Sequence, residues 1–390
     1  MQGFVYPNEM EIGWGLAIVL YPYITGLVAG AFIVSALYHV FRIQAFEPLA
    51  RFSLLTALAF LIVAPLPLLL HLGRPERGFE IFITPHFTSA MSGFGYIWLS
   101  YFVVLVGEVW FTFREDIIRY AQTSRGLKRG IYRVLTLGVD EVSDRTKRVD
   151  HRMAWFLAAL GIPLASTLHG YVGFIFSSIK ANPWWSSPLA PFFFLLSAIV
   201  SGMALLLVLY VLLSRLRRTP LDMRCVRMLM GWLGAFLTVD LVFEGFEIVS
   251  LLYEQEESWP MIRQMLLERA DISFFVIQVL LGTFLPLLLL ASSLTLTRSN
   301  RIKVAAGVTS ALLIMVGVLA MRWNIVIGGQ LISKSFRGLL EFTPPLWGPE
   351  GLVVTAGLLL LPFINLTVIL YLLPPWAQAD DAVVEPNAGS

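Results

Sequence analysis

Three carboxylates, Asp240, Glu244 and Glu247, interrupt a long apolar stretch of this sequence. A charged side chain at the centre of a bilayer costs about 2.5–3.5 kcal/mol, so such groups are expected to have a function. Spacings of four and three residues place the three acids on one stripe of a helix. Either some of them are protonated, or arginines and water meet them. The stripe is a candidate proton relay, and an inter-helix polar clamp is the alternative.

His169 lies in a second apolar stretch, within the segment STLHGYVG (166–173). It shares a helix face with Gly173, whereas Tyr171 points elsewhere. Glycine has no side chain, so another helix can pack closely at these positions, or a flat ring can fit there. A lone histidine in a soluble core is usually satisfied by a hydrogen bond, but a histidine in hydrocarbon indicates a functional role.

His71 precedes the segment LGRPER (72–77), in which Pro75 is expected to end the helix after Arg74. His71 and Arg74 should therefore lie at the outer membrane boundary. The imidazole could hydrogen-bond a carbonyl oxygen and exchange a proton near neutral pH. Alternatively, the backbone satisfies His71 at a helix end, and Arg74 pairs with a carboxylate or caps helix carbonyls.

Two further features of the apolar stretches could contribute to chemistry. Pro22, between Tyr21 and Tyr23, should kink its helix and free backbone carbonyls. Glu108 is an isolated acid near the inner end of its span, and it pairs with a basic loop residue or belongs to an inner half-channel.

The elements that carry these residues are membrane-spanning helices. The chain has 390 residues, of which 57% are hydrophobic and 14% charged, and its mean hydropathy is +0.76. A span needs about 20 apolar residues, and the stretches are too long for barrel strands. We therefore predict an all-α integral membrane protein, a polytopic helical bundle with nine spans: 13–40, 51–72, 92–113, 153–178, 188–214, 226–252, 272–297, 303–321 and 351–374.

Lysines and arginines predict the orientation of the bundle. The loops after the first, third, fifth and seventh spans, with their flanking residues, carry 20 of the 28, and the opposite side carries eight. The positive-inside rule places the N-terminus outside and the C-terminus in the cytoplasm. Residues 1–378 should form the transmembrane domain and 379–390 a disordered cytoplasmic tail. The basic loop 114–152 should hold a short amphipathic helix on the inner leaflet rather than bind nucleic acid.

The sequence argues against a resident redox centre in this chain. Its only cysteine, Cys225, excludes an intrachain disulfide, an iron–sulfur cluster and a structural zinc site, so no metal site is expected. A bis-histidine heme needs two intramembrane histidines, and only His169 lies clearly inside. A redox function would therefore use a diffusible cofactor such as a quinone.

Three segments carry a family resemblance. LHLGRPERGFEIFITPHFTSAMSGFGYIW (70–98) resembles the motif of the NrfD/PsrC-type polysulfide-reductase membrane subunit family. TLHGYVGFIF (167–176) and RWNIVIGGQLISKS (322–335) resemble the longer branch of that family. This branch includes the hydrogenase-2 membrane subunit and the quinone-reactive subunits of alternative complex III. The resemblance covers nearly the whole chain.

The resemblance implies a quinone-reactive membrane subunit of a respiratory oxidoreductase in the bacterial cytoplasmic membrane, without heme or an iron–sulfur cluster of its own. It implies a four-helix bundle that binds menaquinone or ubiquinone near the outer face. An iron–sulfur, ferredoxin-like subunit would dock on that face. The same complex would contain a molybdopterin, hydrogenase or multiheme cytochrome subunit.

The resemblance also assigns roles to single residues. His169 matches the fourth-helix histidine that the longer branch implicates in quinone binding, and His71 occupies the place of an Asp or His before LGRP. Where some members have histidine and asparagine in the first helix, this chain has Tyr21, Tyr23 and Thr25. With these matches, we expect the cofactor-binding residues to be His71, His169, Tyr171, Arg74 and Tyr23.

The three acids of the sixth span and His169 are then expected to transfer protons, and Glu108 to extend a path toward the cytoplasm.

Two other functions fit the same residues. Kinked helices and midplane acids also occur in proton-coupled secondary transporters. A purely structural membrane anchor is the third reading. Co-purification of an iron–sulfur partner and bound quinone would favour the first function.

Overall fold

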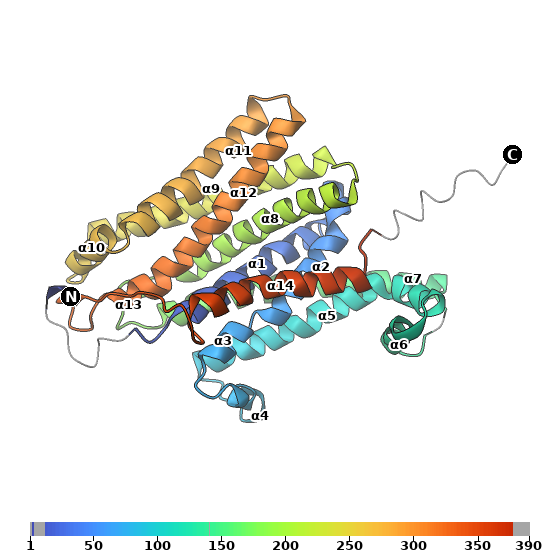
Figure 1. The fold of residues 1–390 in the computed structure, drawn as a ribbon, viewed down its shortest axis with the longest axis horizontal. Helices are drawn as coiled ribbons and strands as arrows, with labels where there is room; N and C mark the ends of the chain where they lie inside the picture. The colour runs from blue at the N-terminus through green and yellow to red at the C-terminus, as the bar shows by residue number, and fades with distance from the viewer. Residues whose placement is uncertain (1, 4–11, 140, 377–390) are drawn as a thin grey trace.

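The structure, a computed structural model, describes residues 2–3, 12–139 and 141–376 (Figure 1). Long helices run side by side along the longest dimension of the molecule. In chain order the elements are β1 (Gln2–Gly3), α1 (Leu16–His39), η2 (Gln44–Phe46), α2 (Glu47–Val63), α3 (Leu66–His71), η3 (Pro75–Arg77), α4 (Glu80–Ile83), α5 (Ala90–Thr123), α6 (Gly126–Leu135), α7 (Asp144–Ser177), α8 (Ala190–Arg217), α9 (Met223–Glu254), α10 (Trp259–Glu268), η4 (Asp271–Phe284), α11 (Leu285–Thr295), α12 (Asn300–Trp323), η5 (Asn324–Gly328), α13 (Gly329–Leu331), β2 (Gly338–Leu339) and α14 (Leu352–Leu372).

The expected all-α membrane fold is confirmed. Within the described part of the chain, eight helical segments are long and apolar enough to cross a membrane. They correspond to all predicted spans except the sixth. That span is α9, a 32-residue helix outside this group of eight, which packs against α8 and α11 in the same bundle.

The helices form two packed groups. One contains α1, α2, α5 and α7, with α14 against α2, and the other contains α8, α9, α11 with η4, and α12. α1 and α8 join the groups at a close crossing of Gly30 and Gly202. A Cβ atom on Gly30 would lie 2.6 Å from the Gly202 Cα, so only glycine permits this approach.

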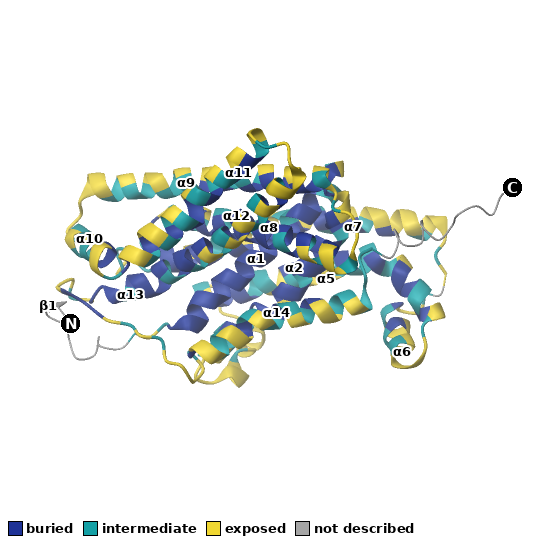
Figure 2. Cartoon of the chain, turned by 45° about the horizontal axis from the view of Figure 1, so that its top comes forward, coloured by how far each residue is buried: buried dark blue, intermediate teal, exposed yellow. Residues whose placement is uncertain are grey.

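The buried residues lie where the two groups meet. Figure 2 shows α1 almost entirely buried, whereas α9, α11 and α14 expose their outward faces. Those faces are apolar, with Leu288 67% exposed and Leu360 60% exposed. Large exposed apolar surfaces are what a membrane-embedded protein presents to lipid.

Several helices extend past the predicted spans. α5 runs to Thr123 rather than 113, and α7 begins at Asp144 rather than 153. The predicted span 303–321 is also too short, because α12 runs to Trp323 and continues through η5 and α13 to Leu331, which shortens the connector to 332–351. Arg322 is 1% exposed and lies among helices. It therefore does not count among the basic residues of the outer loops. The rest of the connector pairs β2 with β1, Gln2 opposite Leu339 and Gly3 opposite Gly338.

The basic loop contains the expected short helix, α6, at the end of the molecule opposite β1 (Figure 1). Tyr132 anchors it by donating to the Leu372 carbonyl at 2.6 Å. Leu127 and Val134 are 84% and 74% exposed, as suits a helix lying on lipid. The predicted tail, 379–390, lies outside the described residues.

Candidate functional site

A large cavity of about 800 Å³ lies between the N-terminal ends of α1 and α5, the C-terminal end of α7, α3 and the segment 72–82. We call it the histidine cavity. Its walls are mainly apolar and include Ile18, Phe94, Trp98 and Phe176. Its polar lining residues are Tyr21, His71, Arg74, Arg77 and Glu80.

His71 is held in this cavity by a carboxylate from the other end of the chain. His71 Nδ1 lies 2.7 Å from Glu350 Oε1. The other oxygen, Glu350 Oε2, accepts a hydrogen bond from the Ala17 backbone N–H at 2.9 Å. Ala17 lies in the first turn of α1, where backbone N–H groups lack helical partners and favour an anion. The pair fixes the imidazole ring and directs Nε2 away from Glu350.

The outer segment completes the entrance to the cavity. Arg77 Nε donates to Glu80 Oε1 at 2.7 Å. Arg74 is exposed, lines the cavity and makes no hydrogen bond or ion pair with the described residues. The predicted pairing of Arg74 with a protein carboxylate is therefore not seen in this part of the chain.

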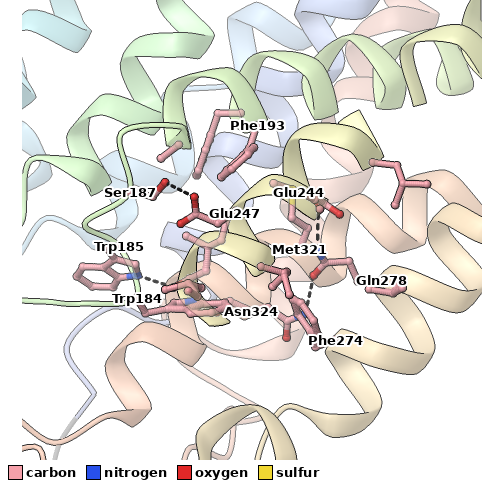
Figure 3. Close-up of a pocket in the computed structure, with 18 of the residues that line it drawn as sticks. Trp184, Trp185, Ser187, Phe193, Glu244, Glu247, Phe274, Gln278, Met321 and Asn324 are labelled. Carbon is pink, nitrogen blue, oxygen red and sulfur yellow. Dashed lines mark hydrogen bonds between the residues drawn. The ribbon is translucent and has the colours of Figure 1, made fainter. Parts of the chain in front are cut away.

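A second cavity, of about 430 Å³, lies between α8, α9, η4 and the end of α12 (Figure 3). We call it the carboxylate cavity. Its polar lining residues are Ser187, Glu244, Glu247, Gln278 and Asn324, and most of its wall is aromatic or aliphatic.

A hydrogen-bonded chain crosses one wall of the carboxylate cavity. Ser273 Oγ donates to Asn324 Oδ1 at 2.6 Å, and Asn324 Nδ2 donates to Gln278 Oε1 at 2.8 Å. Gln278 Nε2 then donates to Glu244 Oε1 at 3.2 Å. On the other side, Ser187 Oγ donates to Glu247 Oε2 at 2.8 Å. The polar groups of this cavity are thus oriented by the protein.

Two π-helical segments carry three of the four residues of this hydrogen-bonded chain. η4 carries Ser273 and Gln278, and η5 begins at Asn324. π-helices are rare and are found frequently at functional sites. η4 also approaches α12, which η5 continues, because Gly282 faces Gly317 of α12, and a Cβ on either glycine would lie 2.5 Å from the opposite Cα.

Arg322 is a buried cation that the sequence analysis missed. Its guanidinium donates to Ser197 Oγ at 2.7 Å and to the Phe194 carbonyl at 3.3 Å, and it lies over the Phe194 ring. Asp240 and Glu244 are close enough for electrostatic interaction with it. No carboxylate in the described chain forms a salt bridge with it. A charged residue inside an otherwise apolar helix is the signal that could have found it.

The predicted acids of α9 do not all line one cavity. Glu244 and Glu247 line the carboxylate cavity, whereas Asp240 is buried outside its lining, and its Oδ1 has no hydrogen-bond partner among the described residues. Glu108 lies on α5, in the other helix group, and neither of its oxygens has a partner in the described part of the chain.

His169 lies deep between α7 and α1. Its Nδ1 is 2.6 Å from the Ala165 carbonyl and its Nε2 contacts the Thr25 carbonyl. It is 2% exposed and lines neither cavity.

The two predicted tyrosines also lie apart from the cavities. Tyr23 donates its hydroxyl to the Met315 carbonyl at 3.2 Å, between α1 and α12. Tyr171 packs against Gly93 of α5 and against Phe174. The structure therefore brings His71 together with Arg74, and Glu244 together with Glu247, while His169, Tyr23, Tyr171 and Asp240 lie elsewhere.

A thin aromatic wall separates the two cavities. Phe176 lines both of them. Trp14 of the histidine cavity stacks on Trp185 of the carboxylate cavity, with ring centroids 5.1 Å apart. Phe176 meets both tryptophans edge-on.

The geometry is that of a membrane protein with two apolar cavities, each carrying proton-exchanging side chains at a fixed place. Among the described residues, no three His, Cys, Asp or Glu side chains gather closely enough to hold a metal ion.

Comparison with known proteins adds a family and several relatives. Residues 5–334 match the family described as "Polysulphide reductase, NrfD". The chain is 31% identical to a selenate reductase subunit of Mesobacillus selenatarsenatis, over 90% of this chain and 84% of that protein. It is 29% identical to a putative dimethyl sulfoxide reductase membrane subunit of Halobacterium salinarum, over 96% and 86%. It is 26% identical to the Hdr-like menaquinol oxidoreductase integral membrane subunit of Archaeoglobus fulgidus, over 84% and 73%.

Proposed function

This chain belongs to the polysulphide reductase NrfD family, and from that premise we propose that it is the quinone-reactive membrane anchor of a respiratory oxidoreductase complex. It is a multi-pass integral membrane protein, and its relatives are named as membrane subunits or as subunits of reductases. One relative is named as a menaquinol oxidoreductase subunit. The proposed substrate is accordingly menaquinone or ubiquinone, in its oxidised or reduced form.

The observation that carries this proposal is the His71–Glu350 pair in the histidine cavity. A cavity of about 800 Å³ with apolar walls and few polar groups is typical of a small-molecule site, for which volumes are roughly 300–1,000 Å³. Within it, only a ligand with a flat apolar body and a polar edge uses both the aromatic walls and the histidine.

The pair can move a proton at a defined atom. The Glu350 carboxylate accepts from Nδ1–H of His71 and thereby leaves Nε2 as the acceptor of the neutral imidazole. Nε2 can then take the proton of a quinol hydroxyl, and the carboxylate stabilises the resulting imidazolium. In the opposite direction, the imidazolium donates to a quinone carbonyl.

The electrons would pass to or from a partner subunit on the outer side. We propose an iron–sulfur subunit next to the exposed segment 72–83, where the histidine cavity is closest to the surface. A molybdopterin, hydrogenase or multiheme cytochrome subunit would carry the other half-reaction. The bacterial cytoplasmic membrane is the proposed location.

Proton translocation is a further part of the proposal. Asp240, Glu244 and Glu247 lie within two turns of α9 and could relay protons, with Arg322 near the first two. Purified complex in proteoliposomes tests this part. A Glu244→Gln variant should keep its assembly and slow proton-coupled turnover, whereas the absence of any pH change during turnover in the native complex would contradict translocation.

The central test is the purified native complex with a His71→Gln variant. We expect its quinone turnover to fall at least about tenfold, the typical lower range for loss of a general acid–base group. His86→Gln is the matched control, because His86 lies in the same outer segment but outside the histidine cavity.

Unchanged turnover in His71→Gln would remove the proposed site, and a complex without quinone turnover would leave a structural anchor. Purification of the chain as a stable single subunit that transports a solute would favour the secondary transporter instead.

A further inference from the structure

We propose that the carboxylate cavity is a second ligand site, which binds a lipid-soluble aromatic diol, a hydroquinone, from the bilayer. The inference goes beyond the proposed function, because the histidine cavity alone would suffice for quinone chemistry. It concerns binding only.

The position and shape of the cavity fit a ligand that arrives through lipid. Its rim on α9 and η4 includes Val249, 61% exposed, and Phe275, 44% exposed, on the outward faces of those helices. Its inner walls include the rings of Trp184, Phe193 and Phe274 (Figure 3). A volume of about 430 Å³ lies in the range of small-molecule sites, roughly 300–1,000 Å³.

The polar groups of the cavity favour a ligand that donates hydrogen bonds. Glu244 uses Oε1 for Gln278, and Glu247 uses Oε2 for Ser187. Within the described chain, the second oxygen of each carboxylate has no hydrogen-bond partner. An ionised carboxylate only accepts hydrogen bonds. In the ionised form of the two acids, the free oxygens therefore complement the hydroxyl groups of a diol and repel the carbonyl oxygens of a quinone.

A lipid acyl chain satisfies this cavity less well. It would fill the apolar space but would leave the second oxygen of each carboxylate facing hydrocarbon without a donor, which is costly. The hydrogen-bonded chain from Ser273 through Asn324 and Gln278 fixes the Glu244 carboxylate in place, so it cannot turn away to find another partner cheaply.

The second site is physically separate from the first. Phe176 and the stacked Trp14 and Trp185 stand between the two cavities. The polar groups of the histidine cavity include the donors Arg74 and Arg77, whereas the carboxylate cavity has two acidic acceptors. We therefore expect the two cavities to differ in their preference for quinone and quinol.

Photolabelling of the purified complex in lipid nanodiscs tests the inference. The probe is a 2,3-dialkyl-1,4-naphthoquinol with a diazirine on its alkyl chain, kept reduced under argon, and mass spectrometry maps the labelled peptides. We expect one set of labelled peptides from the histidine cavity, within residues 65–98. A second set should come from the carboxylate cavity, within residues 241–251 and 274–279. A fatty acid with the same diazirine is the control for an acyl chain.

Two glycines of α9 provide matched variants. Gly245 and Gly231 are both exposed and both have open space at the Cβ position, but only Gly245 lines the carboxylate cavity. Gly245→Trp should reduce labelling of the second peptide set about tenfold and leave the first unchanged, which corresponds to about 1.4 kcal/mol of binding. Gly231→Trp should change neither set.

Glu247→Gln tests the chemistry of recognition. An amide can donate to a carbonyl oxygen, so the preference of the second site for quinol over quinone should fall about tenfold, the effect of losing one charged hydrogen bond. Equal labelling by the fatty acid, or second-set labelling that Gly245→Trp does not reduce, would overturn the inference. Loss of only the first set would instead count against the proposed function.

Discussion

Arg322 links side chains that are far apart in the sequence. It donates to Ser197 of α8 and lies within electrostatic range of Asp240 on α9 and of Tyr21 on α1. Opposite charges attract strongly in an interior of low dielectric constant, so the guanidinium and the nearby acids stabilise one another. Arginine suits the position because its planar group stacks on Phe194 while it donates to the backbone.

Arg322→Met should destabilise the protein by about 1–3 kcal/mol, because the buried Ser197 hydroxyl and Phe194 carbonyl lose their charged donor. Thermal unfolding of the purified complex measures this. The double variant Arg322→Met/Asp240→Asn should recover part of the loss. Arg301→Met, at the exposed start of α12, should change stability by less than about 0.5 kcal/mol. A double variant as unstable as the single one would show that the two residues do not interact.

Glu350 should matter to quinone turnover although it is distant from the family motif in the sequence. Glu350→Gln keeps an acceptor for the Ala17 N–H but removes the charge that holds and stabilises the His71 imidazolium. We expect kcat to fall about tenfold, consistent with loss of one charge-assisted hydrogen bond. Glu76→Gln, an exposed acid of the same outer face, should leave kcat unchanged. Equal kcat in both variants would contradict the role of the pair.

The chemistry of single residues was only partly predictable. His71 could be selected because Pro75 predicts a helix end a few residues after it, although α3 already ends at His71. Its partner Glu350 could not be predicted, because it lies 279 positions away in the sequence and no local pattern joins the two residues. For Asp240, helical spacing gave the shared stripe with Glu244, but neighbouring helices decide which acids face a cavity.

The pairing of η4 with α12 depends on two glycines. Because Gly282 and Gly317 touch backbone to backbone, a methyl group at either position must push the helices apart. The separation would also lengthen the hydrogen bond between Gln278 and Asn324, which joins the same two elements.

Gly317→Ala should therefore lower the free energy of unfolding by about 1–3 kcal/mol, the usual cost of overpacking. Thermal unfolding of the complex measures the effect. Gly231→Ala is the control, since its Cβ would meet nothing within 4 Å and alanine favours a helix. If both variants unfold at the same temperature, the close crossing does not constrain the helices.

Helix type was not predictable for these elements. Hydropathy marks 272–297 as one span and cannot distinguish α from π winding, because it measures how apolar the stretch is and not its hydrogen-bond pattern. The same limitation explains the wrong end at Arg322. A charge usually marks the end of a span, but here the helix continues because Ser197 and the Phe194 ring satisfy the guanidinium.

The all-α membrane fold of the whole chain is the part that hydropathy predicts best. Apolar runs longer than about 20 residues leave few alternatives, since lipid offers no hydrogen bonds to the backbone. Packing between the two helix groups could not be predicted from hydropathy. It depends on contacts such as Gly30 with Gly202, which no apolar run reveals.

The orientation is directly testable because the only cysteine, Cys225, is buried. A cysteine introduced at Glu76 should react with a membrane-impermeant maleimide in intact spheroplasts. One introduced at Arg129, on α6, should react only after the membrane is permeabilised. The wild-type protein gives the background level of maleimide labelling. The opposite pattern would invert the topology that the basic loops predict.

Phe176 belongs to both cavities, and this has a consequence for equilibrium binding. A ring that moves to admit a guest on one side changes the room on the other, so the two occupancies should be thermodynamically linked. Linkage is reciprocal: whatever factor the first guest applies to the affinity of the second, the second applies to the first. Phe176→Ala should weaken this linkage, because it removes the ring that both cavities share and leaves only the stacked Trp14 and Trp185 between them.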